Sequence, residues 1–299
     1  MSLTVLQGAV EQGFIYSLVA LGLYLSYRTL DVADLTTDGS FTLGAACSAI
    51  LTIGGHPVQG LLLALAAGAL AGFVTALLQT RLGVQPILAG IVTMTGLYSV
   101  NLMVMGGRSN LNMLKEANVF TAAEGLLGPA GKLVLAGILA LLVGAGLALF
   151  LRTQLGLSIR ATGDNREMVA ASSIDPAFTT TVGLCAANAM VALSGGLLVQ
   201  YQKFSDISLG TGMVVIGLAS LIIGEVVMGR RSVVRGVAAA LVGAVIYRII
   251  IATALVSTKV GAQNFKLVSA VIVAAAISWP AIREELRFYQ LRREVERNG

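Results

Sequence analysis

Charged residues are scarce in this chain: Asp, Glu, Lys and Arg make up 12% of its 299 residues, whereas hydrophobic residues make up 56%. Soluble domains usually carry about 25% charged residues. The composition therefore excludes a soluble domain over most of the length, and lipid is the expected solvent. Glycine, by contrast, is abundant at 35 residues, which suits helices that pack closely inside a membrane.

Cysteine, histidine and proline are rare as well, with 2, 1 and 5 copies. Cys47 and Cys185 lie in apolar runs, so we interpret them as small packing residues rather than as a disulfide or a metal site. His56 has no neighbouring cluster of ligand residues, and the H-x-x-x-H and H-E-x-x-H patterns do not occur. We therefore expect no metal site and no catalytic residues, which argues against a polytopic membrane enzyme.

The main feature of the sequence is a series of long hydrophobic runs. A run of about 20 apolar residues can cross a bilayer as a helix. The sequence predicts an all-α polytopic membrane protein with about 8–9 transmembrane helices in one domain, residues 1–281, followed by a polar tail, residues 282–299. The second run is short, so it either extends into the polar stretch before it or is re-entrant. The predicted spans are residues 8–28, 39–54, 59–81, 85–106, 132–151, 177–200, 212–229, 233–256 and 264–281.

Positive charge sets the expected orientation, because loops rich in Lys and Arg stay in the cytoplasm. With the N-terminus outside, the inner loops and the tail hold 13 Lys and Arg residues and the outer side holds 6. We therefore expect a multi-pass protein with a cytoplasmic C-terminus. If residues 29–54 do not cross, the N-terminus moves inside while all later segments keep their side.

Two pairs of segments suggest an internal repeat. RLGVQPILAGIVTM from Arg81 resembles KVGAQNFKLVSAVIV from Lys259, and ADLTTDGSFTLG from Ala33 resembles FSDISLGTGMVV from Phe204. An odd number of predicted spans separates the copies, so they would have opposite orientations. Inverted repeats of this kind are common in transporters, although chance similarity between apolar segments would also explain so few identities.

The longest polar interval, LSIRATGDNREMVAASSIDP, lies between the fifth and sixth predicted spans. Asp164 can cap a helix, and Glu167 stands three residues later, as in a capping box. Asp175 and Pro176 end this helix and begin the next span. We predict a cytoplasmic helix of about eight residues, near 165–172, whose small face suits a groove on another protein. A loop helix without a partner is the alternative.

Polar residues in or near the spans are candidates for a solute pathway. The break LDVADLTTDGSF disfavours a continuous helix, and unwound backbone is tolerated at membrane depth only inside protein or beside water. An ordinary loop is the alternative. For the polar residues within spans, hydrogen bonds between helices are the more common role. The candidate pathway residues are Asp34, Thr37, Asp38, Tyr98, Asn101, Asn188, Asp206 and Arg248.

Arg248 is the most informative of these candidates, because it lies inside the eighth predicted span. A charge at that depth costs about 2.5 kcal/mol or more on insertion scales. We therefore expect Arg248 to face the interior of the bundle and to pair with Asp38 or Asp206. Snorkelling of its long side chain toward the outer interface is the alternative.

The polar interval resembles the coupling loop of ABC importer permeases, in the family of branched-chain amino-acid and ribose-type permeases. Members carry a pattern close to R-A-x-G-x-N-x-x-x-A-x-x-x-G-I, with Ser173 in place of the last glycine here. The segments DLTTDGSFTLGAA, ALSGGLLVQ and GLASLIIGEVVMG extend the resemblance over about residues 8–281, and it is closest to the branch of tryptophan- and tyrosine-type permeases. The matching residues are Arg160, Ala161, Gly163, Asn165, Ala170 or Ala171, and Ile174.

The resemblance implies a permease subunit of an ATP-driven importer in the bacterial inner membrane. The implied solute is a small polar nutrient such as an amino acid. ATP and Mg would bind to a separate ABC ATPase, because the chain has no G-x-x-x-x-G-K-S/T motif, and no cofactor is expected on the chain itself. The other implied partners are a second permease copy, an external solute-binding protein and membrane lipid, with no nucleic acid. The coupling loop, residues 153–176, would dock on the ATPase through Arg160, Gly163, Asp164, Asn165, Arg166, Glu167, Met168 and Ala171.

A secondary transporter or channel that works without an ATPase is the alternative function. Such a protein would also contain inverted repeats and a charge inside a span. Its transport would depend on an ion gradient rather than on ATP.

Overall fold

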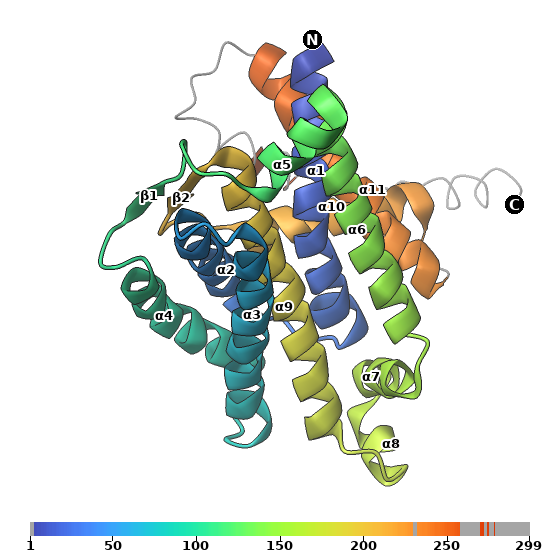
Figure 1. Cartoon of the computed structure of the whole chain (residues 1–299). Coiled ribbons are helices and arrows are strands. Elements are labelled where there is room, and N and C mark those ends of the chain that lie inside the picture. Colours follow the sequence, from blue (N-terminus) through green and yellow to red (C-terminus); the bar gives the residue numbers. More distant parts are fainter. Residues whose placement is uncertain (1–2, 230–231, 258–269, 272–273, 275–277, 279–299) are drawn as a thin grey trace, which may run out of the picture.

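The computed structural model describes residues 3–229, 232–257, 270–271, 274 and 278. This part of the chain forms a bundle of helices with one small two-stranded sheet (Figure 1). The elements are α1 (Leu3–Leu23), the π-helix η1 (Tyr24–Thr29), α2 (Thr36–Ile53), α3 (Pro57–Thr80), α4 (Pro86–Val104), β1 (Asn110–Asn112), α5 (Val119–Leu127), the 3-10 helix η2 (Gly128–Ala130), α6 (Gly131–Phe150), α7 (Gln154–Asp164), α8 (Arg166–Ala171), α9 (Pro176–Gln202), β2 (Phe204–Asp206), α10 (Met213–Met228) and α11 (Val233–Ser257).

Eight of the nine predicted spans correspond to helices. Within the described residues, six helical stretches are long and apolar enough to cross a membrane: α1 with η1, α3, α4, α5 with α6, α9 and α11. Two further helices, α2 and α10, are more polar or shorter, and each follows a break in the helical chain. The ninth predicted span, 264–281, lies almost entirely outside the described residues. The chain is therefore an all-α polytopic membrane protein, as predicted.

Helix α9 lies at the centre of the bundle (Figure 1). It packs against α2 and α3 on one side and against α1 on the other, and α1 in turn packs against α6, α10 and α11. Helix α4 packs mainly against α2 and α3. Helix α2 is deeply enclosed, because 14 of its 18 residues are buried.

The bundle has two distinct ends. The N-terminus of α1, helix α5 and strands β1 and β2 gather at one end, and α7 and α8 lie at the opposite end (Figure 1). Strand β1 pairs antiparallel with β2, with Leu111 opposite Ser205. We call these the β1–β2 end and the α7–α8 end.

Proline and one left-handed residue set several helix boundaries. Pro57, Pro86 and Pro176 each occupy the first turn of their helices, where the missing amide proton costs nothing. Lys203 adopts φ 58° and ends α9. The predicted start of the sixth span at Asp175 and Pro176 is confirmed, because the Asp175 carboxylate accepts the amide of Ala177 at 2.8 Å.

Glycines bring the backbones of α2, α3 and α9 into direct contact. A Cβ at Gly44 would lie 1.9 Å from the carbonyl oxygen of Ala192, and one at Gly195 would lie 2.0 Å from that of Phe41. In the same way, a Cβ at Gly72 would lie 2.3 Å from a carbonyl oxygen of α9. Small residues of this kind let helices approach closely in a membrane, where lipid gives little drive for association.

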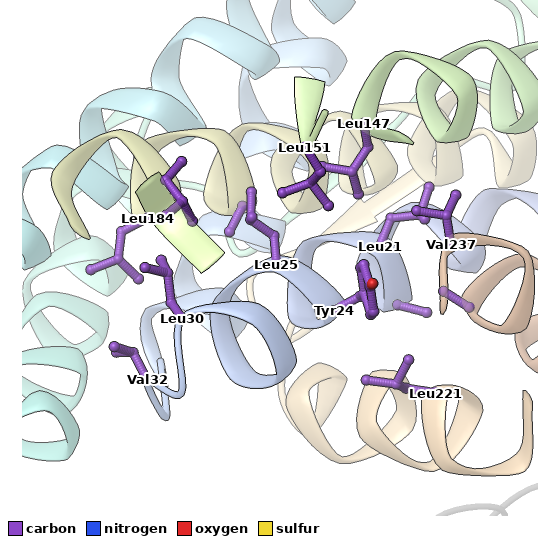
Figure 2. Packing of buried hydrophobic residues seen from close by; sticks show 14 of the residues in the cluster. Leu21, Tyr24, Leu25, Leu30, Val32, Leu147, Leu151, Leu184, Leu221 and Val237 are labelled. Carbon is purple, nitrogen blue, oxygen red and sulfur yellow. The ribbon is translucent and has the colours of Figure 1, made fainter. Parts of the chain in front are cut away.

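A hydrophobic cluster ties the remaining helices together near the α7–α8 end. Figure 2 shows its side chains converging from α1, η1, α6, α9, α10 and α11. Ile159 of α7 is fully buried in the same cluster, so α7 is anchored in the core rather than lying loosely on the surface. The labelled members are Leu21, Tyr24, Leu25, Leu30, Val32, Leu147, Leu151, Leu184, Leu221 and Val237.

The glycine contacts generate a test of this packing. We expect Gly44→Ala to lower the free energy of unfolding by about 1–3 kcal/mol, because its methyl group overlaps the backbone of α9. The matched control is Gly146→Ala in α6, where nothing lies within 4 Å of the new Cβ. This control should be neutral or slightly stabilising because alanine favours helix by about 1 kcal/mol. Thermal unfolding of the detergent-purified protein compares the two variants. Equal unfolding midpoints for Gly44→Ala and Gly146→Ala would contradict the close contact between α2 and α9.

Candidate functional site

The first break in the helical chain separates η1 from α2 and contains a buried carboxylate. Asp34 is 3% exposed; its Oδ1 accepts the amide of Thr36 at 2.9 Å and its Oδ2 accepts the Asn188 side-chain amide at 2.6 Å. The hydroxyl of Ser40 donates to Asn188 Oδ1 at 2.7 Å, and that of Thr37 donates to the Asp34 carbonyl at 3.1 Å. These bonds fix the break between α2 and α9. The stretch is therefore not a continuous helix, as the sequence predicts.

The second break, residues 203–212, separates α9 from α10 and repeats the local geometry of the first. Asp206 Oδ1 accepts the amide of Ser208, two residues later, at 2.7 Å, as Asp34 does with Thr36. This agreement supports the pairing of the two segments in the predicted inverted repeat. The other pair of segments includes residues outside the described part of the chain, so the full repeat stays a prediction.

The two breaks meet inside the bundle. Asp38, in the first turn of α2, accepts the amide of Gly212 through Oδ2 at 2.8 Å and the amide of Val214 through Oδ1 at 2.9 Å. Thr42 Oγ1 accepts the amide of Gly210 at 3.0 Å. The carboxylate of α2 thus caps the N-terminus of α10, which favours negative charge.

A cavity of about 220 Å³ lies beside this meeting point. Asn101 is 2% exposed; its side-chain nitrogen donates to the Gly39 carbonyl at 3.3 Å, while its Oδ1 is buried and has no partner in the described part of the chain. Tyr98 is exposed, and Asp38 is the charged residue of the described lining. The residues lining the cavity are Asp38, Gly39, Thr42, Met94, Thr95, Tyr98, Asn101, Ile207 and Thr211.

The cavity brings together three of the candidate pathway residues, Asp38, Tyr98 and Asn101. Asp34, Thr37 and Asn188 lie in the buried network at the first break. Asp206 lies in β2, toward the β1–β2 end, and Arg248 lies elsewhere, on α11. The candidate pathway residues therefore fall into three groups: three line the cavity, three form the buried network at the first break, and two lie apart from both.

Arg248 faces the bundle, but it does not pair with Asp38 or Asp206 as the sequence suggests. Its guanidinium lies over the ring of Tyr16, 3.8 Å from the centroid, and Tyr16 stacks on Phe41 with centroids 6.2 Å apart. Asp38 and Asp206 instead accept backbone amides. A cation–π contact stabilises a partly desolvated guanidinium, so the ring of α1 takes the place of the expected carboxylate.

Sequence reasoning missed Glu11, a carboxylate of α1 that is 4% exposed. Its Oε1 accepts the Gln7 side-chain amide at 2.9 Å and its Oε2 accepts the Tyr201 hydroxyl at 2.9 Å. The available signal was the same one that singled out Arg248: an ionisable residue inside a predicted span, 8–28.

The candidate coupling loop, residues 153–176, contains two helices, α7 and α8, rather than one, and two local predictions about it are wrong. Asp164 is the last residue of α7, and the cap of α8 is Asn165, whose Oδ1 accepts the amide of Met168 at 2.9 Å. The predicted capping box of Asp164 with Glu167 does not form, and α8 has six residues. The reason is that Thr153 caps an earlier helix, which continues through Asp164.

The candidate coupling residues divide into an exposed tip and a set of anchors. Asn165, Glu167, Met168 and Ala171 are exposed on or beside α8, at the extreme α7–α8 end. Gly163 is an anchor, because a Cβ there would lie 2.0 Å from the carbonyl oxygen of Thr29.

Three more of these residues lie against the bundle. Arg166 is exposed but donates to the Thr180 hydroxyl of α9 at 3.1 Å. Arg160 and Asp164 line a cavity of about 270 Å³. The same cavity is lined by Arg28 of η1 and Glu225 of α10, which form an ion pair at 2.9 Å.

The chain matches known transport proteins over most of its length. Residues 5–277 match the family model described as "Branched-chain amino acid transport system / permease component". The chain is 35% identical over 270 residues to the tyrosine transport system permease protein of Clostridioides difficile (strain R20291), covering 90% of this chain and 89% of that protein. It is 29% identical over 282 residues to an uncharacterised protein of Rickettsia prowazekii (strain Madrid E), covering 92% and 98%.

A solved structure shares the fold. PsaBC from Streptococcus pneumoniae in complex with Fab is similar with a TM-score of 0.50 and 12% sequence identity, covering 91% of this chain and 89% of that chain. At this level of identity the similarity concerns the arrangement of the helices alone.

The network at the first break generates a second test. We expect Asn188→Ala to lower the free energy of unfolding by about 2–3 kcal/mol, because the buried Asp34 carboxylate loses an amide donor. The matched control is Asn112→Ala, whose Oδ1 accepts one amide in an exposed turn, and it should change stability by less than about 0.5 kcal/mol. Unfolding by SDS in mixed micelles compares the two variants; similar losses would mean that the buried network does not hold the break.

Proposed function

Because the chain belongs to the family of branched-chain amino acid transport system permease components, we propose that it is the membrane subunit of an ATP-driven importer for an amino acid or a related small polar nutrient. As a permease component of a transport system, the chain is a transport subunit and not an enzyme. The observation that carries the proposal is the meeting of two helix breaks beside a cavity whose lining includes a carboxylate and an amide. Unwound backbone at such a position is typical of a solute pathway.

The name of the Clostridioides difficile relative supports an amino acid as the solute. The cavity suits such a solute, because its lining combines a carboxylate, an amide and hydroxyl groups with the side chains of Met94, Tyr98 and Ile207. Polar groups that fix orientation within a partly apolar pocket are usual in small-molecule sites.

The hairpin of α7 and α8 gives a mechanical route from an ATPase to this cavity. The exposed tip of α8 would dock on the ATPase, while Ile159 and Gly163 hold α7 against the core and against Thr29. The neighbouring Arg28 pairs with Glu225 of α10, the helix whose opposite end is capped by Asp38 at the cavity. A displacement of the hairpin would thus reach α1 and α10 together, as rigid elements that shift against their neighbours.

The expected assembly follows from this route. The α7–α8 end lies on the cytoplasmic side of a bacterial inner membrane, in agreement with the excess of Lys and Arg in the loops and the tail on that side. The C-terminus is cytoplasmic and the N-terminus is outside. An ABC ATPase that binds ATP and Mg docks at the α7–α8 end, a second copy of the permease completes the pathway, and a solute-binding protein delivers the solute at the β1–β2 end.

Reconstitution tests the importer against the alternative, a secondary transporter or channel. The permease, an ABC ATPase that co-purifies with it and a solute-binding protein from the same organism are placed in liposomes, and uptake of labelled L-tyrosine is measured. We expect uptake to require ATP and to persist when ionophores remove all ion gradients. Uptake by the permease alone, driven by a gradient and independent of ATP, would establish the alternative instead.

The exposed tip generates a third prediction. Met168→Arg should reduce ATP-dependent uptake at least tenfold, because a bulky charge replaces a flexible apolar side chain on the proposed docking face, 63% exposed in the single chain. Met168→Leu keeps an apolar side chain of similar size and should transport normally. Membrane insertion, checked by membrane fractionation, should be equal for both. Wild-type transport by Met168→Arg would remove α8 from the coupling route.

A further inference from the structure

The cavity at the two breaks presents hydrogen-bond acceptors and a negative charge, and we propose that it binds the ammonium group of the solute, with Asp38 and Asn101 as the ligands. This inference rests on the proposed transport function and adds to it the chemical group that the membrane subunit itself recognises.

The first argument is charge. Asp38 is the charged residue among the described lining residues, and no Lys, Arg or His is among them. Its carboxylate accepts one amide at each oxygen, from Gly212 and Val214. Each carboxylate oxygen has a further lone pair, so both can accept again. The N-terminus of α10 contributes about half a positive charge, which leaves the cavity negative and therefore selective for a cationic group.

The second argument is the unpartnered oxygen of Asn101. The side chain is 2% exposed, and its nitrogen is held by the carbonyl of Gly39 at 3.3 Å. The amide cannot be turned round without bringing its oxygen against that carbonyl, so Oδ1 has no donor in the described part of the chain, although its residue lines the cavity. Buried acceptors are almost always satisfied, and a lone one indicates a missing ligand or water. An ammonium group supplies the donor.

The third argument is an account of the hydroxyl protons. Thr95 Oγ1 donates to the Ile91 carbonyl at 2.8 Å, and Thr42 Oγ1 donates to the Asp38 carbonyl at 3.2 Å. Their protons are therefore used within their own helices, and Thr95 offers only lone pairs to the cavity. The hydroxyls of Tyr98 and Thr211 can donate or accept. An ammonium group has three donors and no acceptor, which matches the acceptors of Asp38, Asn101 and Thr95. A carboxylate in the position of the ammonium group would meet Asp38 without a compensating cation among the described lining residues.

The rest of the solute has a place beside this subsite. Met94, Ile207 and the ring of Tyr98 form the less polar part of the lining. An amine-bearing solute with an apolar or aromatic side chain therefore fits the cavity, whereas an acid without an amine does not.

A cysteine reporter tests the charge preference in the reconstituted permease–ATPase complex. In a background with Cys47→Ala and Cys185→Ser, Thr95→Cys places a thiol on the cavity wall. Its rates of modification are measured with 2-aminoethyl methanethiosulfonate, which carries an ammonium group, and with the anionic 2-sulfonatoethyl methanethiosulfonate. We expect the ratio of the two rates to exceed that of a free thiol in solution about tenfold. Adding Asn101→Leu should lower the ratio at least threefold, and adding Asp38→Asn should return it to about the free-thiol value.

Thr93→Cys is the matched control, because Thr93 is on the same helix and also donates to a carbonyl four residues earlier, but lines an apolar groove instead. It should show no preference for the cationic reagent. An unchanged ratio at Thr95→Cys, or a raised ratio that survives both Asn101→Leu and Asp38→Asn, overturns the ammonium site. Because Asp38 also caps α10, gel filtration checks its assembly, and Asn101→Leu decides the result if Asp38→Asn does not assemble.

Uptake measured on the same reconstituted complex separates the two proposals. ATP-dependent uptake without a charge preference at Thr95→Cys rejects the ammonium site and leaves the importer in place. A charge preference that depends on Asp38 and Asn101, together with uptake that needs no ATP, supports the site and rejects the ATP-driven importer.

Discussion

The position of α10 beside α2 depends on the hydrogen bonds that the amides of Gly212 and Val214 donate to the carboxylate of Asp38. A helix that begins inside a membrane protein leaves its first amides without helical partners, and lipid cannot satisfy them. Here the carboxylate of Asp38 in α2 accepts two of these amides. The two bonded residues, Gly212 and Val214, are 174 and 176 residues away from Asp38 in the sequence. Without this cap, the amides of Gly212 and Val214 would lose the acceptor that they have at the start of α10.

The helices form two groups, each held together by close packing, and a few polar contacts join the two groups. The glycine contacts hold α2, α3 and α9 together through their backbones, whereas α1, α10 and α11 pack against one another beside them. The α7–α8 hairpin touches both groups, through Thr162 and Thr179 on α9, 2.8 Å apart, and through Gly163 against Thr29. Asp38 is the link between the groups at the cavity. A motion of one group relative to the other would therefore change the cavity wall directly.

Hydropathy, proline and breaks in the apolar pattern predicted most of the fold. The start of α9 at Pro176 and the two interruptions before α2 and α10 follow from local residue chemistry. Helix α7 was missed because its composition is polar. The signals that could have predicted it are the threonine cap at Thr153 and a buried face that includes Ile159. The partners of Asp38 and Arg248 could not be predicted, since they are backbone amides and an aromatic ring from distant helices, and the local sequence carries no trace of either.

Helix α2 has a consequence for biogenesis. It holds Asp38 and many small polar residues, and it is not among the described helices that are apolar enough to cross a membrane by themselves. Insertion by the translocon depends on the hydrophobicity of each segment. Helix α2 should therefore leave the translocon only together with α3, as a helical pair. A nascent chain that stops after residue 56 should therefore leave α2 outside the bilayer.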